Sequence, residues 1–392
     1  MPVLNRIAGY AAEMAEWRRW LHRNPELGFD LPRTSRFVAE RLREIGVDEL
    51  HEGIAQTGMV ALIHGRKAGP VIGLRADMDA LPIHEETGAA HTSETEGKMH
   101  ACGHDGHTAM LLGAAKYLAE TRRFAGTVAL IFQPAEEMGG GGQVMCREGI
   151  MERFGIGRVF GLHTSPDMPA GSFATRSGPL LAGVDDFRIT LRGVGGHAGW
   201  PEACADPVAA AVQLASALNT VLARNLSAFD NVVLSVTQIR AGSTSNVVPA
   251  DGLVTGTVRS FSQEAQALVK RRMQEICDGI AAAMGVKIAL DYREEYPATV
   301  NHAAETAFAV EVAREVAGAG NVDPDRAMVM GAEDFSFMLE ARPGAFLFLG
   351  QGEGPRCHHP AFDFNDEVAP VGASFFARLI ERALPLDGQA GA

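Results

Sequence analysis

The chain has 392 residues, 46% of them hydrophobic and 21% charged, and a formal net charge of −13. This length predicts two domains, because a single hydrophobic core rarely extends so far. The negative charge argues against nucleic acid or an anionic membrane surface as a partner. No stretch reaches the roughly 18 apolar residues that a membrane helix needs.

The five cysteines, at positions 102, 146, 204, 277 and 357, are odd in number and widely spaced. A disulfide framework is therefore not expected. Residues 1–20 carry charged side chains in a helical pattern and have no signal-peptide core. Together these features predict a cytoplasmic protein.

The first part of the chain alternates between helical and strand patterns. Helices are predicted over 5–20, 33–45, 106–120 and 144–154, and strands over 58–64, 71–75, 126–132 and 157–162. The runs at 71–74 and 128–132 are continuously apolar, as in strands buried on both faces. Alternating strands and helices predict an α/β domain with a mostly parallel mixed sheet and helices on both faces.

The pattern changes near Ala182. Strands with one polar face are predicted over 187–192, 232–238, 253–260 and 287–292, with helices over 207–224 and 264–284. This β-α-β-β-α-β order matches the ferredoxin-like plan. A helix over 303–316 and a strand over 345–349 then resemble the helices and buried strands of the first part of the chain. We therefore predict one α/β domain, 1–182 and 297–392, interrupted by an α+β domain at 183–296, with a disordered tail at 387–392.

The segment from Met99 to His107 contains one thiol and three imidazoles. Cysteine and histidine bind borderline-soft divalent metals well. In an extended backbone, Cys102 and His104 leave on the same face, and Asp105 is expected to cap the helix that follows. The alternative is a loop whose cysteine packs as a hydrophobic residue and whose histidines form local hydrogen bonds.

Other metal-compatible side chains follow strands of the same predicted sheet. Asp77 and Asp79 follow the strand at 71–75, and Glu136 and Glu137 follow the strand at 126–132. The carboxyl ends of such strands form the ligand crevice of an α/β sheet. Adjacent residues of an extended chain point in opposite directions, so one glutamate would bind metal while the other faces a water. Asp77 and Asp79 would accept hydrogen bonds from metal-binding histidines. The ordinary alternative is that these four acids lie in solvent-exposed turns and bind no metal.

Several motifs, in the same order along the chain, resemble the M20 peptidase family. The resemblance is greatest to its aminoacylase branch, the hippurate hydrolases and indole-acetyl-amino-acid hydrolases. The matching segments are LHRNPEL at 21–27, GLRADMDALP at 73–82, CGHDGH at 102–107, FQPAEE at 132–137, GLH at 161–163, GAEDFS at 331–336 and FND at 364–366.

This resemblance implies two divalent metal ions in each subunit. The implied ligands are Cys102, His104, Glu137, His163 and His358. Cys102 takes a bridging position, and the family's His-x-Pro pattern selects His358 rather than His359. Zinc or manganese is expected, and cobalt or nickel would suit the same ligands. A bridging thiolate would also make the site oxidisable.

The resemblance also implies that Glu136 is the general base for a metal-activated water. The inserted domain would be a lid or dimerisation domain of a homodimer or tetramer. Its His197 matches a histidine that usually reaches the active site of the partner subunit, and Asn246 and Arg259 match positions that bind substrate. Trp200 departs from the smaller or more polar residues of relatives.

The predicted function is hydrolysis of an N-acyl amino acid, N-benzoyl, N-acetyl or similar, to a carboxylic acid and a free amino acid. Within the family, a dipeptidase or a deacetylase is the nearest alternative. A thiol hydrolase with Cys102 as nucleophile and His104 or His107 as base is a different class, but it gives Glu137, His163 and His358 no role. The non-enzymatic alternative is a dimeric small-ligand-binding protein.

Overall fold

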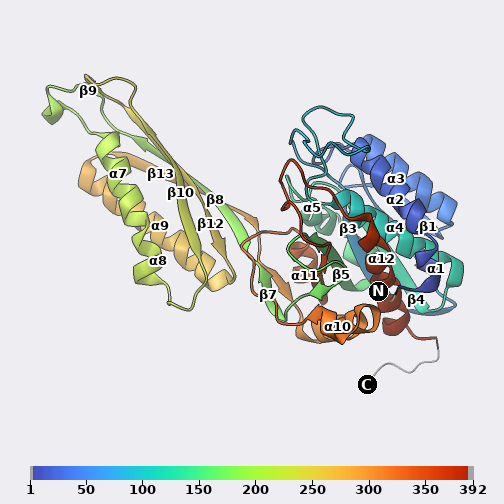
Figure 1. Cartoon of the computed structure of the whole chain (residues 1–392). Helices are drawn as coiled ribbons and strands as arrows, with labels where there is room; N and C mark the ends of the chain where they lie inside the picture. The colour runs from blue at the N-terminus through green and yellow to red at the C-terminus, as the bar shows by residue number, and fades with distance from the viewer. Residues whose placement is uncertain (1–2, 387–392) are drawn as a thin grey trace. The chain divides into compact units, whose positions relative to one another are not determined.

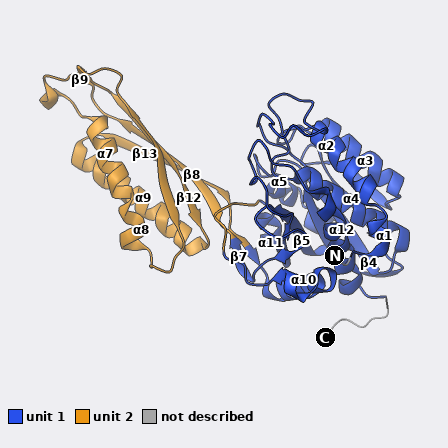
Figure 2. Cartoon of the chain, viewed as in Figure 1, with its two compact units in different colours: residues 1–180, 300–327, 334–392 blue, residues 181–299, 328–333 orange. Residues whose placement is uncertain are grey.

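The structure, a computed structural model, describes residues 3–386 (Figure 1). The chain forms two compact units (Figure 2): unit 1 comprises 1–180, 300–327 and 334–392, and unit 2 comprises 181–299 and 328–333. Residues 328–333, predicted in the first domain, group with unit 2 by their contacts. In the described part of the chain, no helix combines the length and apolar character needed to cross a bilayer.

Unit 1 is built on a mixed sheet with the strand order β1-β2-β4-β3-β5-β16-β6-β15. The central strands β4, β3, β5 and β16 are parallel, whereas β1 and β2 are antiparallel to their neighbours. The predicted mostly parallel sheet is therefore confirmed. The bounds are β1 Glu49–Ile54, β2 Gly58–His64, β3 Lys67–Asp77, β4 Ala125–Gln133, β5 Ile156–Ser165, β6 Phe173–Ala174, β15 Val322–Asp323 and β16 Gly344–Gly350.

Helices cover both faces of this sheet. On one face α4 packs against α2, α3 and α12 and is almost wholly buried, while α5, α6 and α11 cover the other face. Burial on both faces explains why the central strands are apolar at successive positions. The bounds are α1 Asn5–Ala8, α2 Ala11–Arg23, α3 Pro32–Ile45, α4 His104–Thr121, α5 Gly141–Arg147, α6 Ile150–Arg153, α10 Ala303–Ala317, α11 Ser336–Ala341 and α12 Ala369–Ala383, with 3-10 turns η2 Ala319–Asn321 and η3 Asp366–Val368.

Unit 2 has an antiparallel sheet in the order β10-β12-β8-β13, with its helices packed on one face. Phe187, Ile189 and Leu191 of β8 face these helices and alternate with residues on the open face. The element order is that of the ferredoxin-like plan. The bounds are β8 Gly183–Arg192, β9 Gly196–His197, η1 Pro201–Ala203, α7 Pro207–Leu218, α8 Thr220–Asn225, β10 Val233–Ala241, β11 Val247–Val248, β12 Asp251–Ser260, α9 Gln263–Met284 and β13 Lys287–Tyr296; β7 Gly178–Leu181 pairs with β14 Thr299–Asn301 where the chain passes between the units.

Some predicted boundaries are wrong. The helix expected over 5–20 is divided into α1 and α2, and Gly149, with φ 78°, separates α5 from α6. Asp105 does not cap α4, because that helix begins at His104 and its N-cap is Gly103, at φ 90°. β1 and α12 were not predicted from the sequence. The predicted disordered tail lies outside the described residues.

Gly106→Ala is expected to destabilise unit 1. A Cβ at position 106 in α4 would lie 2.3 Å from the Phe364 ring, and overpacking of this kind costs about 1–3 kcal/mol. Gly279 in α9 is the matched control, since nothing lies within 4 Å of its Cβ position and alanine favours a helix interior by about 0.5–1 kcal/mol. Calorimetry should show a lower midpoint for Gly106→Ala and a higher one for Gly279→Ala. A rise in both would contradict the packing at Phe364.

Candidate active site

The candidate site residues of unit 1 gather at the carboxyl ends of its parallel strands. Asp77 ends β3, Gln133 ends β4 immediately before the Glu136–Glu137 segment, and His163 lies near the end of β5. The pairing of β3 with both neighbours brings these ends to one edge. His104 and Cys102 approach the same edge from the start of α4.

Two groups of metal-compatible donors share the Cys102 sulfur. One group is Cys102, His104 and His163, and the other is Cys102, Glu137 and His358. Within each group the donor atoms lie within 4.8 Å of one another. A shared central donor is what a bridged pair of cations requires. The structure thus brings together the five side chains predicted as ligands.

His104 has the surroundings of a metal-binding histidine. Its ring is 1% exposed, and among the described residues neither ring nitrogen has a hydrogen-bond partner. Its Nδ1 lies 3.4 Å from Asp79, and its Nε2 lies 3.8 Å from Asp77 and 3.9 Å from Glu137. A buried polar nitrogen without a partner is costly, and a cation at Nε2 would satisfy it. The donors present therefore fit a metal.

His163 and His107 have different ring environments. His163 Nδ1 donates to the Thr164 carbonyl at 2.7 Å, which leaves Nε2 facing the Cys102 sulfur at 3.4 Å. His107 uses both nitrogens, because Nδ1 donates to Asp77 at 2.6 Å and Nε2 accepts from the Thr164 N–H at 2.9 Å. Burial lowers the pKa of His107 to about 4, so this ring is neutral. His107 therefore supports the site structurally.

His358 reaches the site through an unusual backbone conformation. Its φ is 67°, and its N–H donates to the Ala101 carbonyl at 2.7 Å. Its Nε2 lies 3.2 Å from Glu137 Oε1. The neighbouring His359 belongs to none of the donor groups and accepts a hydrogen bond from the Ala361 N–H. Between the adjacent histidines, the geometry favours His358.

Glu136 and Glu137 lie in a turn rather than in extended chain. Their carboxylates do not point in opposite directions, because oxygen atoms of both lie within 4.8 Å of a His104 ring nitrogen and of each other. Asp79 holds this turn by accepting the backbone N–H groups of Glu136 at 3.0 Å and Glu137 at 3.1 Å. The prediction that the two carboxylates point in opposite directions is therefore wrong. Of the two acids, only Glu136 lies outside both groups that contain Cys102.

The residues predicted in unit 2 occupy two places. His197 on β9 lies beside Asn246, since Val247 pairs with His197 and the Ala198 N–H donates to the Asn246 carbonyl at 3.0 Å. Arg259 is near the opposite end of β12, where its guanidinium donates to Thr257 Oγ1. A strand rises about 3.3 Å per residue, so roughly 30 Å separate the two ends of β12. One chain does not bring Asn246 and Arg259 together.

The Trp200 indole lies against the His197 ring, with 4.4 Å between the ring centroids. The Gly199 N–H donates to His197 Nδ1 at 3.0 Å. In the neutral ring the proton is therefore on Nε2, which makes that atom a hydrogen-bond donor.

Comparison with known proteins identifies the family. The profile of peptidase family M20/M25/M40 matches residues 73–382. The chain belongs to this family. It is 39% identical to N-acetylcysteine deacetylase of Bacillus subtilis over 94% of this chain and 96% of the relative. It is 38% identical to hippurate hydrolase of Campylobacter jejuni over 97% and 98%.

A solved structure agrees with this assignment. The Bacillus subtilis YXEP protein, described as a dinuclear metal-binding peptidase of the M20 family, superposes with a TM-score of 0.85 at 35% identity, covering 96% of this chain and 99% of that one. This M20 chain is accordingly a hydrolase with a metal-binding fold.

A buried polar network at the ends of β3 and β4 adjoins the M20 site and was not predicted from the sequence. Arg75, fully buried, donates to Asp77 at 2.7 Å, to Gln133 at 2.9 Å and to Asp334 at 3.0 Å. Asp334 also accepts from the Gln133 amide and from the Gly142 N–H. One sequence feature could have indicated this network. Arg75 and Asp77 are two residues apart on β3, so their charged side chains leave the same face of a strand that is otherwise apolar.

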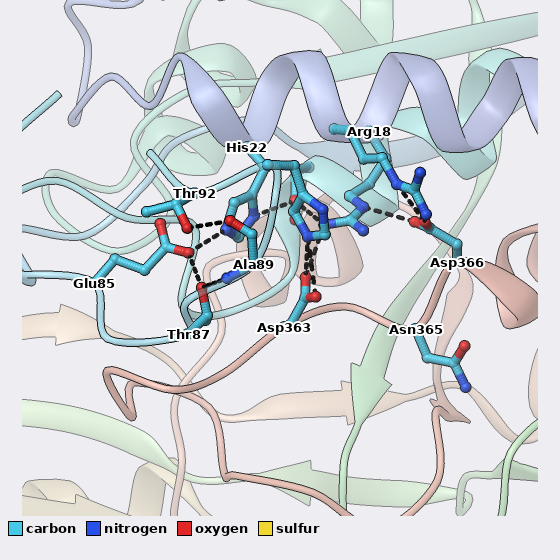
Figure 3. A network of polar contacts seen from close by, with 12 residues as sticks. Arg18, His22, Glu85, Thr87, Ala89, Thr92, Asp363, Asn365 and Asp366 are labelled. Atoms are coloured by element: carbon cyan, nitrogen blue, oxygen red, sulfur yellow. Dashed lines mark hydrogen bonds and ion pairs between the residues drawn. The ribbon is translucent and has the colours of Figure 1, made fainter. Parts of the chain in front are cut away.

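A second network joins α2 to segments beside the site (Figure 3). Arg18 and His22 project from α2, and Arg18 contacts Asp363 at 2.8 Å and Asp366 at 2.7 Å. His22 Nδ1 lies 2.8 Å from Asp105 and Nε2 lies 3.2 Å from Glu85. The network therefore fixes the first turn of α4, which carries His104, and the segment that follows His358.

The His22 contacts predict a pH-dependent contribution to stability. Burial lowers the pKa of His22, but Asp105 and Glu85 outweigh it and raise the pKa to about 9. A histidine in the unfolded chain titrates near pH 6.5. Protonated His22 therefore stabilises the fold fully below about pH 6.5, and this contribution, up to about 3 kcal/mol, is lost as the pH rises through about 9.

Urea unfolding of the wild type and of His22→Gln, from about pH 6 to about pH 10, measures this contribution. The wild type should lose more stability than the variant as the pH rises across this range. Because all other titrating groups are shared, the difference reports on His22. Equal slopes in the two proteins would contradict a protonated His22.

Proposed function

We propose that this chain hydrolyses the amide bond of N-acyl amino acids, giving a carboxylic acid and a free amino acid. The observation that carries the proposal is the pair of donor groups sharing the Cys102 sulfur, with the Glu136 carboxylate beside them and outside both. This arrangement supplies two cation positions and one carboxylate that belongs to neither of them. A thiol hydrolase is disfavoured because it leaves Glu137, His163 and His358 without a role.

The proposed ligands are Cys102, His104 and His163 for one cation, and Cys102, Glu137 and His358 for the other. Zinc or manganese suits these donors, and cobalt or nickel would also fit. When bound, such a pair polarises the amide carbonyl and lowers the pKa of water towards 7. Asp79 faces His104 Nδ1 and would fix the tautomer that leaves Nε2 free to bind metal.

Glu136 is the proposed general base. Its carboxylate is 6% exposed, and its position is set by the hydrogen bond from its own N–H to Asp79. A carboxylate that binds no metal accepts the proton of the attacking water and delivers it to the nitrogen of the departing amine.

His197 is proposed to donate its Nε2–H to the oxygen on which negative charge develops, a use of a preorganised donor. Arg259 and Asn246 are proposed to bind the α-carboxylate of the substrate, the guanidinium through paired hydrogen bonds. Since one chain holds Asn246 and Arg259 at opposite ends of β12, we propose a homodimer in which His197 and Asn246 are supplied by the second subunit.

Glu136→Gln should abolish turnover and leave the metal content unchanged. The amide keeps the shape of the side chain but removes the base, and loss of a general base costs about 10²–10⁴-fold or more. Glu137→Gln is the matched control, because it should lose metal as well as activity. Metal analysis and hydrolysis of N-benzoyl, N-acetyl and dipeptide substrates measure both effects. Near-normal turnover by Glu136→Gln would contradict the base, and preference for dipeptides would favour a dipeptidase.

Mixed dimers test whether His197 acts in the partner's site. Glu136→Gln and His197→Ala are each expected to be inactive. In a dimer containing one of each, the subunit that retains Glu136 receives an intact His197 from its partner, so random mixing should restore about a quarter of wild-type activity. No recovery after verified subunit exchange would place His197 in its own subunit's site.

A further inference from the structure

Two cysteines, Cys102 and Cys357, lie in neighbouring segments beside the proposed metal ligands. The hydrogen bond from the His358 N–H to the Ala101 carbonyl, at 2.7 Å, holds the segments containing Cys357 and Cys102 side by side. Cys357 also packs against the hydrophobic cluster to which Cys102 belongs. The proposed function assigns a role to Cys102 but none to Cys357.

The backbone brings these two cysteines close together. The two cysteines directly flank residues joined by a backbone hydrogen bond, so their Cα atoms are near neighbours, and bridging needs Cα atoms roughly 4.4–6.8 Å apart. All five cysteines lie in the described part of the chain and are free. Of the others, Cys204 donates to the Trp200 carbonyl, while Cys146 and Cys277 lie on α5 and α9.

We propose that Cys102 and Cys357 form a reversible redox site, at which a hydroperoxide produces a disulfide and thereby releases the metals. The release of metal rests on the proposed ligand role of Cys102, whereas formation of the disulfide does not. Because both donor groups contain the Cys102 sulfur, one covalent change removes a donor from each of them. Cytoplasmic disulfides, where they occur, are usually transient and redox-sensing.

The reaction with hydrogen peroxide balances in two steps. The Cys357 sulfur, the more exposed of the two, attacks a peroxide oxygen, the O–O bond breaks, and a sulfenic acid and one water form. The Cys102 sulfur, a thiolate when it binds metal, then attacks the sulfenic sulfur, the S–O bond breaks, and the hydroxide that leaves takes a proton from solvent to become a second water. The two sulfurs lose two electrons, and one peroxide is reduced to two waters. A dithiol reverses the change by thiol–disulfide exchange.

The test treats the zinc-loaded full chain with near-stoichiometric hydrogen peroxide. Peptide mapping after thiol alkylation detects a Cys102–Cys357 linked peptide, and a chromogenic chelator follows released zinc. Both are expected to appear together and to reverse with dithiothreitol and added zinc. Cys357→Ser should bind zinc and turn over substrate normally, form no linked peptide, and release zinc roughly tenfold more slowly. Cys204→Ser, the matched control, should behave as the wild type.

Three results would overturn the proposal. One is oxidation of Cys102 to a sulfinic acid with no linked peptide. Another is equally fast and reversible zinc release from Cys357→Ser. The third is a linked peptide that forms while zinc stays bound, which would refute both the coupling and the ligand role of Cys102. None of these readouts depends on turnover, so failure here is distinguishable from failure of the proposed hydrolysis.

Discussion

One buried carboxylate links the chain segments on which the candidate site depends. Asp79, 1% exposed, follows β3, accepts the backbone N–H groups of Glu136 and Glu137, and lies 3.4 Å from His104 Nδ1. An isolated charge would be strongly unfavourable in this environment. Its contacts lie in the turn after β4 and in the first turn of α4, so one side chain joins these two segments to the end of β3. A side chain outside both donor groups thereby sets the position of the proposed base.

Further buried contacts extend the same constraint to β5. Asp77 accepts from His107 of α4, and His107 accepts from the Thr164 N–H, next to His163. Burial alone would raise the pKa of Asp77, but His104, Arg75 and His107 hold it well below its usual range, so the carboxylate stays charged. Each segment that carries a proposed ligand is thus tied to a neighbour by a charged or polar contact. Such preorganisation limits the rearrangement that metal binding requires.

The sequence alone predicted those elements that a local hydrophobic pattern determines. It did not predict the features that depend on contacts between distant segments. The apolar runs at 71–74 and 128–132 predicted the central strands, whose ends carry the site. The turn at Glu136 was not predictable, because it depends on the distant carboxylate of Asp79 and on positive φ at Ala135. The contact of Arg75 with Asp334 joins residues 259 positions apart. α12 begins with Ala-Pro-Val-Gly, a weak helical pattern, and is stabilised by packing on α4 and α10.

Unit 2 shows that suitable residue types do not by themselves form one binding site. Its sheet holds His197 and Asn246 beyond one end of β12 and Arg259 near the other, and the roughly 30 Å between these ends is far longer than a single α-carboxylate. Within one chain, the two groups proposed to bind that carboxylate cannot contact it together. In the proposed homodimer, His197 and Asn246 of one subunit would complete the site that holds Arg259 of the other, which would resolve the conflict. The separation along β12 is therefore the reason to propose that a complete site needs two subunits.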